Sequence, residues 1–523
     1  MKVLFAQRST WVAGALLVLF AGLTSVSLQG CTDLDEELFG AVTPDNFYRT
    51  DAEILAAVAP IYAQLRTTLD QYHNLSQVSS DETVVPTRGS DWFDGGVWLA
   101  THRHTWTPSL GFLGDAWNNA YTGVARANVV LQTLDEAGTL EENPEIVAEL
   151  RALRAFYYYL LMDLFGGVPI VGDDEYTIDS DNPPARESRA AVFAFLENEL
   201  TEAREVLPDS WPASGYGRMT KGAADAILAN MYVNAEVFTG DATAGGLNRG
   251  PARWQDAITI SDRILNSGVY SLSADWFDNF SADNHGVPEL IMVVAHLAEV
   301  GLGLNFPHRT LHYHQFTPDP WNGFATIAET YAAFDPADAR RQIFLEGRAF
   351  NVETGEPVNN RQDEPLFFTP EIANIENASE GEGVRIFKFP ADPNHLGEHN
   401  GNDYPFFRLA EIYLIKAEAL NELQGPNQES IDLINTLRER VYDPPQPLQL
   451  ADFPSREALR DRILDERLFE LFYEAKRRQD LVRHDRFTEA WTFKNQSEPF
   501  RVLFPIPQSQ RDANPNLTQN PGY

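Results

Sequence analysis

The stretch EALRDRILDERLFELFYEAKRRQDLVRH, residues 457–484, carries the helical spacing on which the fold class of this chain rests. Glu474 and Arg478 stand four residues apart, a spacing that adds modest support on a helix surface. The apolar residues recur at intervals of three and four, as on one buried helix face, and they are Leu464, Leu468, Leu471, Phe472 and Ala475. We therefore predict one continuous helix over residues 457–484.

Similar patterns upstream predict a mainly helical chain. The segment 145–165 is followed by Gly166, Gly167 and Pro169, which commonly stop a helix. In two neighbouring pairs, small residues on the first helix precede bulky ones on the second, which is how tetratricopeptide hairpins pack. The sequence therefore predicts tetratricopeptide-like helical hairpins that support long irregular ligand-binding loops, with a few short strands. The predicted helices are 52–65, 116–134, 145–165, 189–206, 221–237, 254–265, 409–423, 429–441 and 457–484.

Four long stretches between these helices are rich in Gly, Pro, Asp and aromatic residues: 68–115, 170–188, 271–325 and 345–405. Irregular stretches of this length are uncommon in compact domains unless they are functional or unstable. Binding residues concentrate on loops that a rigid scaffold positions. We therefore expect the functional site in these loops.

The only cysteine of the chain, Cys31, closes a segment with the layout of a lipoprotein signal peptide. Two basic residues, Lys2 and Arg8, precede an apolar run over 11–23, and Gly30 stands directly before the cysteine. The run is shorter than the ~20 apolar residues that a membrane-spanning helix needs. A buried structural cysteine is the alternative, but its place at the end of the apolar segment argues against it. We predict that residues 1–30 are removed and that Cys31 is lipidated.

The formal charge of −36 becomes −38 once Lys2 and Arg8 leave with the signal. Such a charge argues against nucleic acid, whose phosphates require Lys and Arg, and against an electrostatic anchor on anionic lipid. Only six of the 40 basic residues are lysines. An acidic, lysine-poor surface favours a salt-loving source, and an ordinary acidic extracellular protein is the alternative.

Motifs for catalysis or metal binding are weak. His395 and His399 have the spacing of an inverted zinc-protease motif, but loop residues surround them and the motif requires a helix. Four further histidines could meet around a metal only if the fold brought them together: His102, His104, His312 and His314. Asp173-Asp174-Glu175 lacks the regular spacing of a calcium loop. We predict no metal site and no cofactor, with calcium as an unassigned option.

Two loops combine aromatic rings with charged groups. The first, 86–98, reads PTRGSDWFDGGVW, and the second places His312, Tyr313 and His314 near Trp321 and Phe324. Flat rings can stack on the C–H face of a sugar, while carboxylate, amide and guanidinium groups bond its hydroxyls. Packing of these rings onto the core is the structural alternative. A glycoside hydrolase, which needs two carboxyl groups ~5 to 10 Å apart, also remains open.

Several stretches together resemble the SusD/RagB family of Bacteroidetes surface lipoproteins. The acidic segment 32–37 after Cys31 resembles the surface-export signal of such proteins. The family usually has glycine where this chain has Ala475, and an aromatic residue often found near Arg478 is missing. The matching stretches are LFGGVP at 164–169, FFRLAEIYL at 406–414, DERLFEL at 465–471, RRQDLVR at 477–483, and the ending LFPIPQ at 503–508 with NLTQNPGY at 516–523.

The resemblance implies a non-enzymatic lipoprotein in the outer membrane that faces the exterior. Such a protein would bind a nutrient, most often an oligosaccharide, and act as a lid on a SusC-like TonB-dependent transporter. A peptide-binding RagB-type member and a surface glycoside hydrolase are the alternatives. The resemblance also implies one globular unit over 31–523, with an N-terminal portion 31–270 and a C-terminal portion 271–523. The candidate ligand-binding residues are Asp81, Arg88, Trp92, Asp94, Trp98, Tyr313 and Trp321.

Overall fold

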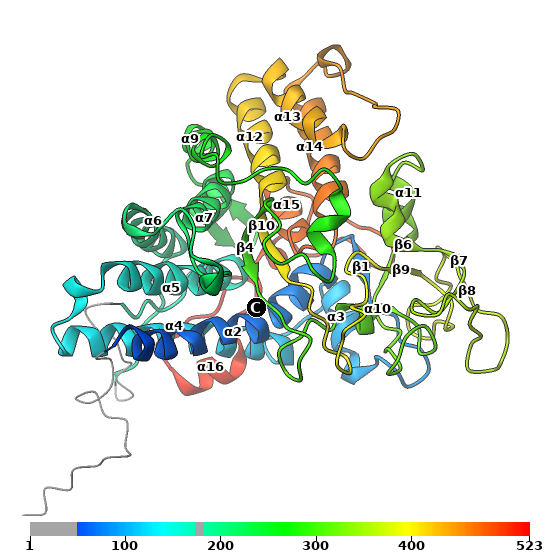
Figure 1. Ribbon diagram of the computed structural model, residues 1–523, viewed down its shortest axis with the longest axis horizontal. Coiled ribbons are helices and arrows are strands. Elements are labelled where there is room, and N and C mark those ends of the chain that lie inside the picture. The colour runs from blue at the N-terminus through cyan, green and yellow to red at the C-terminus, as the bar shows by residue number, and fades with distance from the viewer. Residues whose placement is uncertain (1–49, 173–181) are drawn as a thin grey trace, which may run out of the picture. The chain divides into compact units, whose positions relative to one another are not determined.

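The computed structural model describes residues 50–172 and 182–523, and helices dominate this part of the chain (Figure 1). The predicted segment 1–30, Cys31 and the acidic run Asp173-Asp174-Glu175 lie outside the described residues. The longer helices are α2 (Asp51–Val78), α4 (Gly111–Glu136), α5 (Pro144–Phe165), α6 (Arg189–Val206), α7 (Lys221–Val233), α9 (Trp254–Leu265), α12 (Leu409–Gln424), α13 (Gln428–Arg438), α14 (Arg456–Leu471) and α15 (Arg477–Arg483). The shorter ones are α3 (Val97–His102), α8 (Ala235–Phe238), α10 (Phe306–Thr310), α11 (Ala328–Ala333) and α16 (Gln508–Ala513).

The longer helices pack in chain order, as stacked hairpins do. α2 contacts α4, which contacts α5, and the series continues through α6, α7, α9 and α12 (Figure 1). α13 and α14 both pack on α12. Close approach needs small residues: a Cβ on Gly123 of α4 would lie 2.3 Å from the Tyr157 ring of α5. The mainly helical fold with tetratricopeptide-like pairs is confirmed.

Local sequence signals account for several of the helix ends. α5 stops at Gly166, whose φ of 78° suits glycine. Five α-helices of the described ranges begin at a side chain that accepts a backbone N–H from the first turn, and these N-caps are Thr50, Ser188, Thr220, Asn427 and Ser455. The predicted irregular stretch 68–115 is too long, because α2 continues to Val78, α3 occupies Val97–His102 and α4 begins at Gly111. No helix within the described ranges is long and apolar enough to span a membrane.

Short strands tie the long loops together. In a four-stranded antiparallel sheet β1 pairs with β5, β5 with β9, and β9 with β6, while β4 and β10 form a separate antiparallel pair. The strands are β1 (Thr83–Val84), β2 (Asp241–Thr243), β3 (Gly246–Asn248), β4 (Leu290–Val294), β5 (Ala325–Thr326), β6 (Phe344–Leu345), β7 (Gly347–Arg348), β8 (Phe367–Phe368), β9 (Val384–Ile386) and β10 (Tyr404–Arg408).

The single helix predicted over 457–484 is wrong. α14 ends at Leu471 and α15 begins at Arg477, with Tyr473 (φ 64°) and Ala475 (φ 58°) in the left-handed region between them. The family glycine at the position of Ala475 would adopt this backbone without strain. The predicted surface position of Glu474 is also wrong. Glu474 is buried and accepts hydrogen bonds from Lys388 and Arg408.

A buried carboxyl group braces this break. Glu82, 1% exposed, accepts hydrogen bonds from the Tyr473 backbone N–H (3.1 Å) and from the Gln77 amide. Burial raises the pKa of Glu82 to about 8. The folded chain therefore holds a proton on this group at pH values where the unfolded chain, with a pKa near ~4.3, has lost it.

Replacing Glu82 by Gln is therefore expected to stabilise the protein progressively as the pH rises from 5 to 8. In the wild type, stability from this group falls over that range because the folded state binds the extra proton. We expect the free energy of unfolding of the variant to gain at least about 1 kcal/mol over the wild type between pH 5 and pH 8, since one pKa unit corresponds to about 1.4 kcal/mol. Urea unfolding at both pH values measures this difference. Glu376→Gln, at an exposed position, is the control. The prediction is contradicted if the stability difference between Glu82→Gln and the wild type changes no more between pH 5 and pH 8 than it does for this control.

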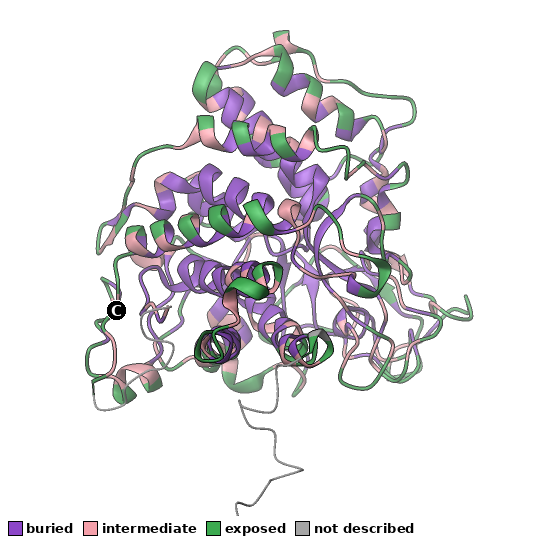
Figure 2. Ribbon diagram, turned by 60° about the vertical axis from the view of Figure 1, so that its left-hand side comes forward, coloured by how far each residue is buried: buried purple, intermediate pink, exposed green. Residues whose placement is uncertain are grey.

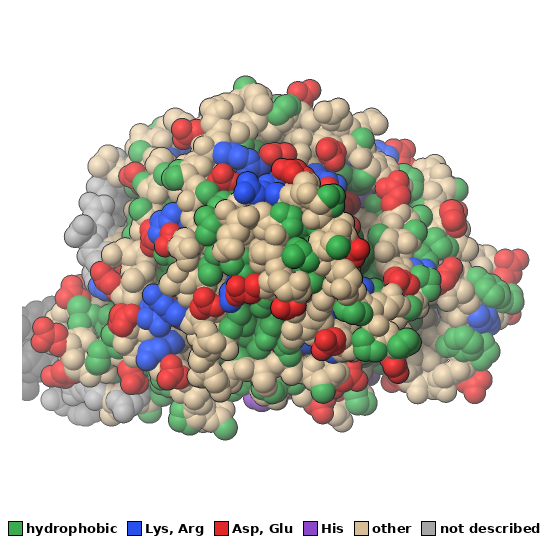
Figure 3. Space-filling view, turned by 90° about the horizontal axis from the view of Figure 1, so that it is seen from above, with side chains coloured by type: hydrophobic (Ala, Val, Ile, Leu, Met, Phe, Trp, Pro, Cys, Tyr) green, Lys and Arg blue, Asp and Glu red, His purple; other side chains and the backbone are tan. Residues whose placement is uncertain are grey.

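The largest apolar core contains residues from Ile54 to Leu517, and helix α5 is buried along most of its length. Figure 2 shows the buried residues concentrated on the helices and strands of the interior. Charged groups are buried as well, and many of them are arginines and carboxylates that form ion pairs. Arg154, Arg340, Arg408 and Arg467 are each at most 1% exposed. Arginine suits such sites because its planar guanidinium binds carboxylates with two hydrogen bonds. On the face in Figure 3, acidic side chains are scattered and the basic ones lie in separate groups.

Candidate functional site

The antiparallel pair β1–β5 brings the two predicted loops together. Thr83 pairs with Thr326 and Val84 with Ala325, so the chain leaving β1 and the chain entering β5 lie at the same end of the pair. Loop 85–96 follows β1, and loop 311–324 precedes β5. The residues that the sequence predicts for ligand binding on these loops therefore converge from segments more than 200 residues apart.

Tryptophan and phenylalanine rings join the two loops. The Trp92 indole N–H donates to the Trp321 carbonyl at 2.6 Å, and their ring centroids lie 6.5 Å apart. Trp92 also packs edge-to-face on Trp98 (5.4 Å) and Phe324 (5.7 Å). Trp92 and Trp321 are half-buried, whereas Trp98 is 6% exposed and belongs to the main core. Trp98 is therefore a support for the loop and not a surface ring.

A charged network continues this face from Tyr313. The Tyr313 hydroxyl donates to Asp91 Oδ2 at 2.6 Å, and the Arg361 guanidinium lies 4.2 Å from the centre of the Tyr313 ring. Arg361 also pairs with Asp91 (3.0 Å) and with Glu380 (2.6 Å), and Glu380 binds His312 at 2.9 Å. The network thus connects four loop segments around one half-buried tyrosine.

The pKa values of this network keep its charges constant near neutral pH. Burial, with the hydrogen bond to Asp91, raises the pKa of Tyr313 to about 12. Burial would raise the pKa of Glu380, but hydrogen bonds from Arg361 and His312 outweigh it and lower the pKa to about 2. Burial lowers the pKa of His312 to about 4, so this ring is neutral at pH 7. The site therefore presents a neutral tyrosine, a guanidinium and carboxylates.

Phe93 is the aromatic residue of this face that the sequence prediction missed. It is 55% exposed, although its neighbour Trp92 packs inward. Trp92 (φ 62°), Asp94 (φ 42°) and Gly95 (φ 68°) all adopt left-handed backbone angles, and this sharp turn points consecutive side chains in different directions. Asp94 is exposed and accepts the Trp98 indole N–H at 2.8 Å. The adjacent glycines were the available signal for such a turn.

Arg88 and Asp81 do not lie on the exposed face. Arg88 is 2% exposed, donates to the Glu382 carbonyl at 2.7 Å, and has its pKa lowered by burial to about 10. Asp81 accepts two hydrogen bonds of 2.8 Å from the Arg477 guanidinium of α15. Both residues are committed to holding the loop on the scaffold. The charged groups of the face are instead Asp91, Arg361 and Glu380, in place of the predicted Arg88 and Asp81.

The candidate metal ligands of the sequence do not assemble. His102 binds the Thr492 carbonyl and His104 lies between Ser79 and Ser497, while His312 and His314 bond other partners. Residues 395–399 form a tight turn and not a helix, which agrees with the rejection of the zinc-protease motif. Across residues 50–172 and 182–523, no three His, Cys, Asp or Glu side chains are grouped to hold a metal.

The scaffold and this face define a helical-repeat protein whose long loops present an aromatic, charged surface. Family models agree with this class: one described as "SusD family" matches residues 225–523, and one described as "Starch-binding associating with outer membrane" matches residues 39–233. The first covers more than half of the 523 residues. The chain belongs to the SusD/RagB family.

Relatives and solved structures with SusD-like names are similar to this chain over most of its length. SusD-like protein P2 of Formosa agariphila is 25% identical over 95% of this chain and 98% of its own length. Starch-binding protein SusD of Bacteroides thetaiotaomicron is 24% identical over 75% of this chain and 74% of its own length. A laminarin binding SusD-like protein has a TM-score of 0.72 at 23% identity, covering 91% of this chain and 100% of that one.

The surface glycan-binding protein A of Bacteroides thetaiotaomicron, solved in complex with laminarihexaose, has a TM-score of 0.70 at 20% identity. This match covers 90% of the present chain and 100% of that chain. At these identities the solved structures establish the shared helical fold of the chain.

Proposed function

We propose that this protein binds an oligosaccharide on the face built by Phe93, Trp92, Tyr313 and Trp321. The observation that carries the proposal is the exposed Phe93, which lies two residues along the loop from Asp91 of the Tyr313–Arg361–Asp91 network. Aromatic faces stack on the apolar face of a sugar ring, and the guanidinium and carboxylates bond its hydroxyl groups. Relatives named for binding starch and laminarin support this ligand class.

We further propose that the protein is anchored by a lipid on Cys31 in the outer membrane and faces the exterior. There it would deliver its ligand to a SusC-like TonB-dependent transporter and act as the lid of that barrel. Family membership and the description of the N-terminal family model support this location and partner. The acidic composition suits an exposed surface, and a salt-loving source remains a prediction from composition.

No chemical step and no cofactor enters the proposed function, because stacking and hydrogen bonding suffice to hold a sugar. The two alternatives make different predictions. A glycoside hydrolase would release new reducing ends from the bound glycan. A peptide-binding member would bind extended peptides in preference to glycans.

Replacing Phe93 or Tyr313 by Ala is expected to weaken oligosaccharide binding by up to about tenfold each, since a stacked aromatic contributes about 0.5 to 1.5 kcal/mol and 1.4 kcal/mol is tenfold. Isothermal titration calorimetry against laminari-, malto- and cello-hexaoses and a peptide panel measures the loss. Trp254→Ala is the matched control, because this half-buried indole begins α9, away from the loops (Figure 1). Binding of peptides alone, or release of sugar ends, would contradict the proposal.

A further inference from the structure

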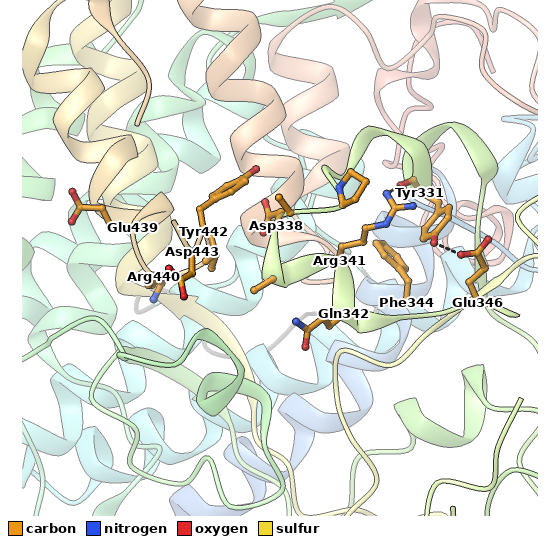
Figure 4. A pocket seen from close by; sticks show the side chains of 14 residues that line it. Tyr331, Asp338, Arg341, Gln342, Phe344, Glu346, Glu439, Arg440, Tyr442 and Asp443 are labelled. Atoms are coloured by element: carbon orange, nitrogen blue, oxygen red, sulfur yellow. Dashed lines mark hydrogen bonds between the residues drawn. The ribbon is translucent and has the colours of Figure 1, made fainter. Parts of the chain in front are cut away.

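A separate cavity of about 540 Å³ opens between the segment 331–346 and the end of the α13 region at 439–443 (Figure 4). Its two walls are joined by the Ala339 N–H, which donates to the Val441 carbonyl at 2.9 Å. The volume lies within the range of about 300 to 1,000 Å³ typical of small-molecule sites. None of the residues of the Phe93 face lines it.

Aromatic side chains form one part of the lining. Tyr331, Phe344 and Tyr442 are buried as residues but contribute to the cavity wall. The Tyr331 hydroxyl donates to Glu346 at 2.6 Å, and the Arg341 guanidinium lies 4.0 Å from the centre of the Tyr331 ring. In Figure 4, Tyr331, Arg341 and Glu346 form one side, and Arg440, Tyr442 and Asp443 the other. The Tyr331 side chain is thus held by polar partners before any ligand enters.

The rim carries hydrogen-bonding groups that the described protein does not use. Within residues 50–172 and 182–523, the side chains of Gln342, Glu439 and Asp443 make no hydrogen bond or ion pair, and all three are exposed. Arg341 donates to the Tyr331 and Phe334 carbonyls through one terminal nitrogen only. The cavity therefore offers an amide, a guanidinium and carboxylates as both donors and acceptors.

A second cavity, of about 730 Å³, shows the opposite chemistry. Its walls are mostly apolar, and its polar groups are already paired: the Tyr121 hydroxyl donates to the Pro169 carbonyl, and the Asn128 amide to the Val171 carbonyl. A sugar entering it would find few hydrogen-bond partners. The smaller, polar cavity is the one with the chemistry for a hydroxyl-rich ligand.

We propose that the cavity between 331–346 and 439–443 is a second carbohydrate site, which takes a short, neutral oligosaccharide. Hydroxyl groups can both donate to the rim carboxylates and accept from Gln342 and Arg341. The rim carboxylates outnumber the one available guanidinium, so sugars carrying carboxylate or sulfate groups would be repelled. The choice of a sugar as ligand class rests on the proposed function.

The test adds a blocking residue to a chain whose Phe93 face is disabled. Ala337 lines the cavity and is exposed, so Ala337→Trp fills the cavity without removing a side-chain bond. Ala332, exposed on α11 and not part of the lining, provides the matched control Ala332→Trp. Calorimetry with laminari-, malto- and cello-hexaose is run on the wild type, on Phe93→Ala/Tyr313→Ala, and on that double variant with either tryptophan.

We expect the wild-type chain to bind two sugars. We expect the double variant to bind one sugar, with lower affinity than the wild type. Ala337→Trp is expected to reduce this residual binding at least tenfold, and Ala332→Trp less than twofold. A single sugar per wild-type chain, or residual binding that survives Ala337→Trp, overturns the second site while leaving the proposed function intact. The second site is also overturned if the double variant binds oligogalacturonate or a lysine-rich peptide more tightly than it binds the neutral hexaoses.

The opposite failure is distinguishable. If the double variant binds as the wild type does and adding Ala337→Trp to it abolishes binding, the cavity is the sugar site and the proposed Phe93 face is wrong. If the wild type binds none of the hexaoses, both proposals are overturned.

Discussion

Replacing Glu470 by Gln is expected to lower the free energy of unfolding by roughly 4 kcal/mol, the cost typical of removing one partner from a buried ion pair. Glu470 is fully buried on α14 and accepts hydrogen bonds from three guanidinium groups. Arg408 donates at 2.7 Å, Arg340 at 2.8 Å and Arg440 at a shorter distance, while the Trp276 indole donates at 3.0 Å. The neutral amide would leave these buried cations undercompensated.

The pH dependence gives a second check on Glu470. Burial alone would raise its pKa, but Arg440, Arg408 and Arg340 outweigh burial and hold the pKa well below its usual range. The carboxylate therefore stabilises the fold above the unfolded pKa of ~4.3, and this contribution is lost as the pH falls below it. The stability difference between wild type and Glu470→Gln should be constant from pH 8 to pH 5 and shrink in stronger acid.

Urea unfolding followed by circular dichroism measures both effects. Glu376→Gln is the matched control, because Glu376 pairs with Arg103 at 2.8 Å with its side chain 59% exposed. Exposed pairs of this kind contribute less than ~1 kcal/mol. If Glu470→Gln costs no more than this control, the buried network is not what holds α14 against the strands.

Replacing Cys31 by Ala is expected to abolish retention of the protein at the cell surface while leaving sugar binding unchanged. The reason is chemical: without the thiol no acyl chain can be attached, and each buried methylene of such a chain contributes about 0.8 kcal/mol of membrane affinity. The Phe93 face lies on loops that follow β1 and precede β5, far along the sequence from Cys31, and its ring and hydrogen-bond contacts are made by residues of these loops.

Membrane fractionation and protease treatment of whole cells measure retention, and calorimetry on the released protein measures binding. Thr32→Ala, one residue further on, is the control that should remain anchored. A Cys31→Ala protein that stays on the membrane would show that another segment anchors it. One that loses sugar binding would show that Cys31 has a structural role.

Helices with clear local signals were predicted well. Arg189–Val206 and Trp254–Leu265 begin and end as predicted, and the glycine stop after Phe165 is where α5 ends. These features depend on side chains within one or two turns of each other, so the spacing of apolar residues and the chemistry of the caps suffice. The continuous helix over 457–484 failed because burial of its charged residues, not local spacing, decides the break before Arg477.

The structure brings the two predicted loops together, and their role in ligand binding stays a prediction. Loops 86–98 and 311–324 do converge, and Trp92, Tyr313 and Trp321 lie on the joint surface. Composition could not distinguish the exposed Phe93 from the buried Trp98, because a turn of left-handed residues decides which ring faces outward. Arg361 could not be found at all, since it meets Asp91 across 270 residues of sequence.

The sequence by itself determined the helical class, the position of several helices, the glycine stop after Phe165, the family likeness and the two aromatic loops. These follow from short-range periodicity and from motifs that need no knowledge of the fold. Only the tertiary structure decided that the charged stretch 465–483 is largely buried, that Arg88 and Asp81 brace the loops, and that Phe93 faces outward. Burial and ion pairing join residues hundreds of positions apart, and no local pattern records which partners the fold will bring together.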